Sequence, residues 1–217
     1  MKTNEVVFAD NQTSLTKSGL LLFLAGVILF MGIITGEIFH PAGFSTRTSY
    51  ISELGASIKP GEAAPQPSAT IFNFTMILTG IMIIIATYFV QTAFRKLLLT
   101  IPLFLFGVGI LGVGIFPGDI APWHGLFALI LFVAGGIAAI TSFKIVCPPL
   151  RYIFISLGTI ALIFLIRYNY FVPSLGVGGT ERWVFYPIVF WVTGFGGYLL
   201  GIKDRQSLVF NQNILVN

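Results

Sequence analysis

The chain has 217 residues, of which 56% are hydrophobic and only 9% are charged, and its mean hydropathy is +0.92. The net charge is +4 and the pI is near 9.3, but the basic residues stand singly or in pairs at the edges of apolar runs. That placement is typical of membrane topology signals and argues against a nucleic-acid partner. The single cysteine, Cys147, excludes an intrachain disulfide. The composition predicts an integral membrane protein whose partners are membrane lipids, and the length allows six spans of roughly 20 residues each.

The N-terminal part of the chain predicts a tail followed by a first span. Residues 1–17 are polar and mixed in charge, whereas residues 18–36 form an uncharged run of 19 residues. A cleaved signal peptide is the alternative, but the tail is long and acidic as well as basic, and the run lacks an Ala-x-Ala site. We therefore expect a membrane-spanning helix here, followed by Glu37 and His40.

A polar segment covers residues 40–67 and contains the sequence Ser-Tyr-Ile-Ser-Glu-Leu-Gly-Ala at 49–56. Proline and glycine interrupt the segment too often for a long helix. The motif itself is predicted to form a short helix, with Thr48 or Ser49 as its N-cap and with Ser52 and Glu53 in its first turn.

Three further spans follow this segment with short connections between them. The second is expected at about 68–94 and the third at about 97–116, with a tight basic turn at 95–96. The fourth span is opened by His124 and runs to about residue 143. Each run is long enough to cross a bilayer.

The last two spans are less regular. The fifth starts near 149 or 152 and runs to about 170, and a glycine-rich loop at 176–183 separates it from the sixth, at about 184–202. Because Arg167 follows a short uncharged run, it is expected inside the outer end of the fifth span or reaching to the interface. The fold prediction is therefore an all-α, polytopic bundle of six transmembrane helices over residues 18–203, between cytoplasmic tails at 1–17 and 204–217.

The orientation prediction comes from the distribution of basic residues. Eight lie on one side of the predicted spans: Lys2, Lys17, Arg95, Lys96, Lys144, Arg151, Lys203 and Arg205. Four lie on the other: Arg47, Lys59, Arg167 and Arg182. The positive-inside rule then places both termini in the cytoplasm. Most acidic residues and both histidines fall on the outer face, so the candidate chemistry is concentrated there.

Glycine spacing in the third span matches G-x-G-x-x-G at residues 107–112. A dinucleotide site needs that motif between a strand and a helix, and no strand is predicted here. We interpret these glycines as positions of close helix packing, where small residues let two backbones approach. The sequence leaves open whether they pack within one chain or between two.

Ser52 and Glu53 are the first candidate site residues. A carboxylate beside a hydroxyl at the membrane face can coordinate a cation, act as a base or bind a cationic headgroup. The alternative is that Glu53 satisfies backbone N–H groups at a helix N-terminus. Asn73, one turn into the second span, is a candidate partner for the same segment, and the two readings of Glu53 stay open.

Asp119 and His124 lie five residues apart across a proline-containing turn, and His40 follows the first span. Aspartate and histidine are both metal ligands, and a zinc hydrolase needs three such ligands with a position left open for water. The alternative is that these are ordinary polar ends of spans. Zinc is therefore a cofactor only under the hydrolase hypothesis, with His124, Asp119 and His40 as ligands.

Arg167, Glu181 and Arg182 form a third group of candidates for ligand binding. Arg167 is expected to pair with Glu37, Asp119 or Glu181, or to hold a lipid phosphate, which suits the guanidinium fork.

Several of these residues carry a resemblance to a known family. The segments are Ile51–Gly55 after the first span, Phe72–Asn73 in the second, Phe116–Asp119 closing the third, and His124. Over residues 18–203 the chain resembles the membrane-protein family named domain of unknown function 998, found in archaea and bacteria. A more distant likeness is to the eukaryotic Frag1/DRAM/Sfk1 family. The resemblance implies six spans, no established activity, and Ser52, Glu53, Asn73, Asp119 and His124 as the site positions.

Three functional hypotheses follow. The first is a non-enzymatic protein of a bacterial or archaeal cell membrane, whose outer pocket, lined by Glu53, Asp119, His124 and Arg167, binds a lipid headgroup or a small polar ligand. The second is a metal-dependent hydrolase acting on a lipid, as in alkaline ceramidases. That family is similar in span count but uses three zinc-binding histidines, whereas this chain has two. The third is a small transporter, which the scarcity of midspan charges disfavours. The sequence does not predict an oligomeric state.

Overall fold

The computed structural model describes residues 2–59 and 61–215, with side chains described for 12–59 and 61–202. Within these ranges the protein is all-helical and contains no strand. It has six α-helices and two short 3-10 helices, in this order: α1 (Lys2–Phe39), η1 (Ile51–Gly55), α2 (Ser68–Phe94), α3 (Leu97–Ile115), α4 (Trp123–Thr141), η2 (Ser142–Lys144), α5 (Leu150–Ile166) and α6 (Tyr168–Leu215).

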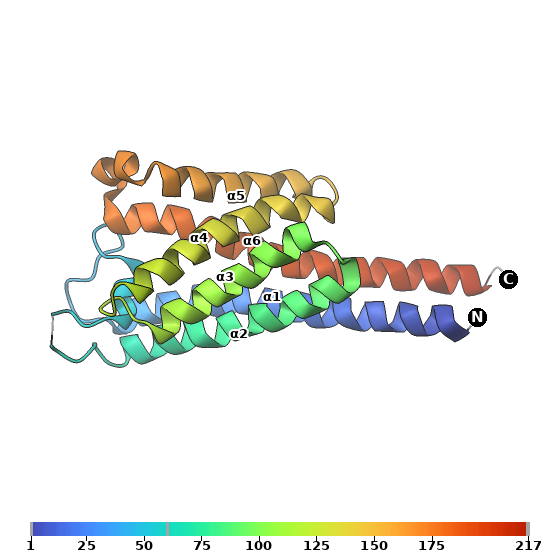
Figure 1. Cartoon of the computed structure of the whole chain (residues 1–217), viewed down its shortest axis with the longest axis horizontal. Coiled ribbons are helices and arrows are strands. Elements are labelled where there is room, and N and C mark those ends of the chain that lie inside the picture. Colours follow the sequence, from blue (N-terminus) through green and yellow to red (C-terminus); the bar gives the residue numbers. More distant parts are fainter. Residues whose placement is uncertain (1, 60, 216–217) are drawn as a thin grey trace.

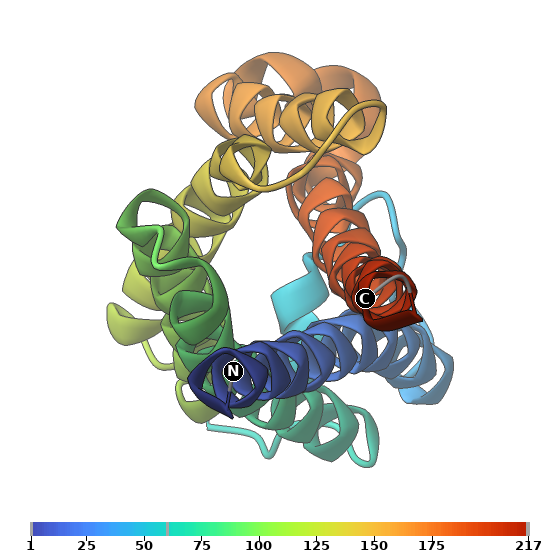
Figure 2. The ribbon, with the colours of Figure 1, turned by 90° about the vertical axis from the view of Figure 1, so that its right-hand side faces the viewer.

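The six α-helices form one elongated bundle in which neighbours in sequence are also neighbours in space (Figure 1). α1 also packs against α6, so the helices form a closed ring when viewed along the bundle (Figure 2). Segment 40–67 and the turn between α3 and α4 lie at one end, which we call the η1 end. The described ends of the chain lie at the other end (Figure 1).

Large apolar side chains fill the centre of the ring and also cover its outside. Trp191 is fully buried and lies against Phe106 and Phe195, with ring centroids 6.3 and 5.6 Å away. On the outer surface many large apolar side chains are exposed, among them Phe74 at 63% and Ile166 at 77%. An apolar exterior around a packed interior is the arrangement expected of a protein whose solvent is lipid.

Five helical segments of the described chain are long and apolar enough to cross a membrane. They are Gln12–Phe39, Ser68–Phe94, Leu97–Ile115, Trp123–Lys144 and Tyr168–Ile202. The helix α5 is apolar but has 17 residues, about 25 Å at 1.5 Å per residue, against a hydrocarbon core of roughly 30 Å. The multi-pass membrane class is confirmed, and the predicted limits of the second span agree with α2.

Three local predictions differ from the structure. Residues 2–17 belong to α1 and are not separated from the first span by a break in the helix. The helix α5 ends at Ile166 instead of near 170, and Arg167 is its C-cap. The predicted loop at 176–183 is wrong, because these residues belong to α6 and only Gly176 departs from helical geometry, with φ 78° and ψ 168°. A cluster of glycines in a sequence usually predicts a loop. In this structure the helix continues through the cluster and bends at one glycine.

The glycines of the third span pack within the chain, which settles a point that the sequence left open. A Cβ atom at Gly107 would lie 3.1 Å from the backbone nitrogen of Ile84 in α2, and one at Gly109 would lie 2.6 Å from Cα of Leu131 in α4. The third glycine of the motif, Gly112, faces the ring of Phe127. The small residues of α3 therefore let both neighbouring helices approach closely, as predicted.

Candidate functional site

The short helix η1 is held by its own acidic residue and by α2. Glu53 Oε1 accepts a hydrogen bond from the backbone N–H of Tyr50 at 3.0 Å, so Tyr50 is the N-cap and the predicted caps Thr48 and Ser49 are wrong. Asn73 Nδ2 donates to the carbonyl of Gly55 at 3.1 Å, and Ser68 Oγ donates to the carbonyl of Leu54 at 3.1 Å. Glu53 is exposed, and its carboxylate accepts a backbone N–H at the start of η1. This is the alternative in which Glu53 stabilises a helix N-terminus.

The chain before η1 lies against the bend in α6. The backbone N–H of Gly178 donates to the carbonyl of Arg47 at 3.0 Å. A Cβ atom at Gly176 or Gly178 would collide with the carbonyl oxygen of Arg47 or Ser49, respectively. Gly176 and Gly178 thus allow a loop to contact a helix backbone directly, and this close approach is the physical reason for glycine at these two positions.

Arg182 joins α1, this loop and α6 through one buried guanidinium group. Its Nη2 forms an ion pair with Glu37 Oε1 at the end of α1. Its Nη1 donates to the carbonyls of Thr46, Ser49 and Gly178 at 3.0–3.1 Å. Arg182 is only 8% exposed. Arg182 therefore stabilises the packing of α1, the loop and α6 against one another. These contacts give no support to its predicted role in ligand binding.

Arg167, which the sequence favoured as the partner of the outer acidic residues, is exposed. It forms no ion pair or side-chain hydrogen bond with any residue whose side chain the structure describes. Arg167 is the exposed C-cap of α5, whereas Arg182 lies six residues beyond Gly176 in α6 and reaches Glu37 at the end of α1.

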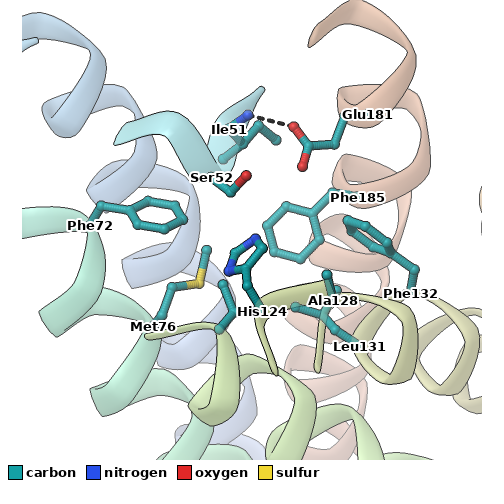
Figure 3. A pocket seen from close by; sticks show the side chains of 11 residues that line it. Ile51, Ser52, Phe72, Met76, His124, Ala128, Leu131, Phe132, Glu181 and Phe185 are labelled. Carbon is teal, nitrogen blue, oxygen red and sulfur yellow. Dashed lines mark hydrogen bonds between the residues drawn. The ribbon is translucent and has the colours of Figure 1, made fainter. Parts of the chain in front are cut away.

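Three polar side chains from three separate elements face one cavity beside η1 (Figure 3). Ser52 comes from η1, His124 from the first turn of α4, and Glu181 from α6. The cavity has a volume of about 20 Å³, enough for a water molecule, and its floor is apolar, with Phe72 and Met76 among its lining residues.

Each of these three side chains keeps a polar atom that has no partner among the described residues. Glu181 accepts the backbone N–H of Ile51 through Oε2 (Figure 3), and its Oε1 accepts nothing from the described residues. His124 Nδ1 lies 2.8 Å from the carbonyl of Phe116, so this nitrogen carries a proton and Nε2 is an acceptor in the neutral ring. The Ser52 hydroxyl has no hydrogen-bond partner within the described chain.

A groove of about 310 Å³ continues from the same three residues along the bundle. His124, Ala128 and Phe132 line it from α4, four residues apart in each case, so it extends about 12 Å along that helix. Leu165 of α5 and Val184 of α6 form its other apolar walls, and the side chains that line its polar end are Tyr50, Ser52, His124, Tyr168 and Glu181.

The other candidate residues lie apart from this cavity and groove. Asp119 Oδ2 accepts a hydrogen bond from Ser57 Oγ at 2.8 Å at the exposed surface. His40 packs against Phe44, with ring centroids 4.9 Å apart. Among residues with described side chains, no three His, Cys, Asp or Glu residues are grouped so that they could hold a metal ion. The structure therefore does not bring His124, Asp119 and His40 together.

Sequence reasoning named Ser52, His124 and Glu181 but placed them in different groups, and it missed Ala128 and Phe132. A signal for the latter pair exists, because they lie four and eight residues after His124 and so share its helix face. No comparable signal joins Glu181 to Ser52, since 129 positions separate them (181 minus 52).

The fold and the apolar helices define a polytopic, all-helical membrane protein with a polar site at one end of the bundle. The chain belongs to the family described as Protein of unknown function (DUF998), which matches residues 23–198. No curated protein and no solved structure matches the chain. These comparisons do not show the more distant likeness to the Frag1/DRAM/Sfk1 family.

Proposed function

We propose that this protein spans the cell membrane six times, with both termini in the cytoplasm, and binds the headgroup of a lipid, or a small polar ligand, at its outer face. The ligand site is the cavity and groove lined by Ser52, His124 and Glu181. A bacterial or archaeal cell membrane is the proposed location, by analogy with the family.

One observation carries this proposal: three unpartnered polar side-chain groups converge at the end of an apolar groove. Polar groups beside hydrocarbon are costly unless they are hydrogen-bonded, so a site of this kind favours a polar occupant. The apolar walls below suit an alkyl chain, and a volume of about 310 Å³ lies at the lower end of the range for small-molecule sites, roughly 300–1,000 Å³.

The proposed orientation predicts the outcome of cysteine labelling. In a Cys147→Ser background, we expect a membrane-impermeant maleimide added to intact cells to label Lys59→Cys and not Lys96→Cys. Both positions are exposed and they lie at opposite ends of the bundle. The physical reason is the excess of basic residues at the end that carries Lys96. The reverse labelling pattern would place the cavity on the cytoplasmic side.

Filling the groove tests the binding site. We expect Ala128→Trp to reduce the amount of co-purified lipid per chain about tenfold, because the indole ring occupies the space that an alkyl chain would take. The measurement is quantitative lipid mass spectrometry on protein purified in mild detergent. Leu129→Trp is the matched control, because Leu129 is on the same helix and 54% exposed.

The two variants separate a specific site from general lipid contact. Equal lipid content in wild type, Ala128→Trp and Leu129→Trp would contradict the proposal. Loss in both variants would indicate a general effect of the added ring on folding, and a thermal unfolding profile of each protein identifies that case.

A further inference from the structure

We infer that the headgroup bound in this groove is a primary amine in its protonated form. This inference rests on the proposed function and adds the chemical class of the ligand. Its starting point is Glu181, which lines both the cavity and the groove and forms no ion pair within the described chain. A carboxylate facing an apolar groove without a counter-charge is unfavourable, and a cation at this position removes that cost.

The nearby arginine side chains do not provide that cation. Arg182 is adjacent in sequence but is paired with Glu37 and bonded to three carbonyls. Arg47 donates to the carbonyl of Ser174, and Arg167 is exposed outside the groove. Because no described lysine or arginine lines the cavity or the groove, a phosphate group would meet the carboxylate without a permanent positive charge to compensate it.

The number and type of the free polar atoms match a primary ammonium group. An ammonium has three donors and no acceptor. Within the described chain the site offers three acceptors without partners, namely Glu181 Oε1, the Ser52 hydroxyl oxygen and the Nε2 of His124 in the tautomer whose Nδ1 carries the proton. A hard metal ion would need more oxygen ligands than one carboxylate and one hydroxyl.

Aromatic side chains around the polar end support the same charge. Tyr50 and Tyr168 line the polar end of the groove, and Phe185 lines the cavity. The faces of such rings attract cations, and this attraction strengthens where water is excluded. The apolar wall from Ala128 to Phe132 then contacts whatever chain the amine carries, so the site favours an amine with an alkyl tail.

The test compares ligands that share one tail. We expect purified full-length protein in dodecyl maltoside micelles to bind dodecylamine with an apparent Kd about tenfold lower than that for dodecanol or dodecyl phosphate, measured by ligand-dependent thermal stabilisation. In Glu181→Gln this preference should disappear, while dodecanol binding stays unchanged. The glutamine carbonyl can still accept the N–H of Ile51, so the variant keeps that contact.

Two further variants, Glu53→Gln and Ala128→Trp, distinguish a failure of the amine inference from a failure of the proposed function. Glu53→Gln removes an exposed carboxylate outside the groove, and it should retain the preference for dodecylamine. Equal binding of all three ligands to wild type, lost in Ala128→Trp, would overturn the amine inference and leave the proposed lipid site in place. Binding that Ala128→Trp does not reduce would overturn the proposed function itself.

Three competitors distinguish a free amine from an amine-bearing lipid as the ligand. Displacement of dodecylamine by ethanolamine at comparable concentration would identify a free amine as the ligand. Displacement by phosphatidylethanolamine, and not by ethanolamine or phosphatidylglycerol, would identify a lipid headgroup. Displacement by phosphatidylglycerol alone would contradict the inference.

Discussion

We expect Arg182→Met to lower the free energy of unfolding by about 3–5 kcal/mol, because the change leaves Glu37 without its partner in a half-buried position. Three carbonyl groups, those of Thr46, Ser49 and Gly178, also lose their donor. The measurement is an unfolding titration with sodium dodecyl sulfate from dodecyl maltoside micelles, followed by circular dichroism and tryptophan fluorescence.

Two further variants show whether the ion pair is the cause. Arg167→Met removes an exposed arginine without a partner and should change the free energy of unfolding by about 0.5 kcal/mol or less. The double variant Arg182→Met with Glu37→Met should be more stable than the sum of the single changes predicts, by about 1–3 kcal/mol. Strict additivity would mean that the two side chains are not coupled.

We expect Trp191→Ala to lower the free energy of unfolding by about 3–5 kcal/mol, since it removes the largest fully buried side chain among the described residues. Trp191 lies against Phe106 of α3 across the bundle, and its Nε1 donates to Ser142 Oγ at 3.3 Å. The same unfolding titration measures this effect.

Trp123→Ala is the matched control, because Trp123 is 52% exposed at the start of α4 and its ring contacts Phe116 alone among the described aromatic residues. Its removal should cost about 1 kcal/mol. If the two tryptophan variants were equally stable, the side chain of Trp191 would not be a packing centre of the bundle.

The Arg182 contacts bear directly on the candidate site. They hold residues 46–49 against α6, and the next residues form η1, which carries Ser52. Glu181 precedes Arg182 in the same helix and accepts the N–H of Ile51. Two adjacent residues of α6 therefore have different roles. Arg182 holds the loop in place, and Glu181 provides the carboxylate that lines the groove.

Much of the architecture was determined by the sequence itself. Runs of apolar residues of span length, interrupted by charges, predict the membrane class and the limits of α2, since an unbroken apolar helix of that length is stable in lipid and not in water. The small residues of α3 predicted close helix packing, and Asn73 was correctly expected to bond to the segment that contains Glu53. These features depend on local patterns, which a single sequence contains.

Only the tertiary structure decided which polar residues meet. The sequence favoured Arg167 as a partner of Glu37, but the structure pairs Glu37 with Arg182, which follows the bend at Gly176 in α6. In the same way, Ser52 and Glu181 share a cavity because the helix ring closes between α1 and α6. The physical reason is that a hydrogen bond or an ion pair depends on distances of a few ångströms between segments more than a hundred residues apart, and hydropathy and spacing contain no information about those distances.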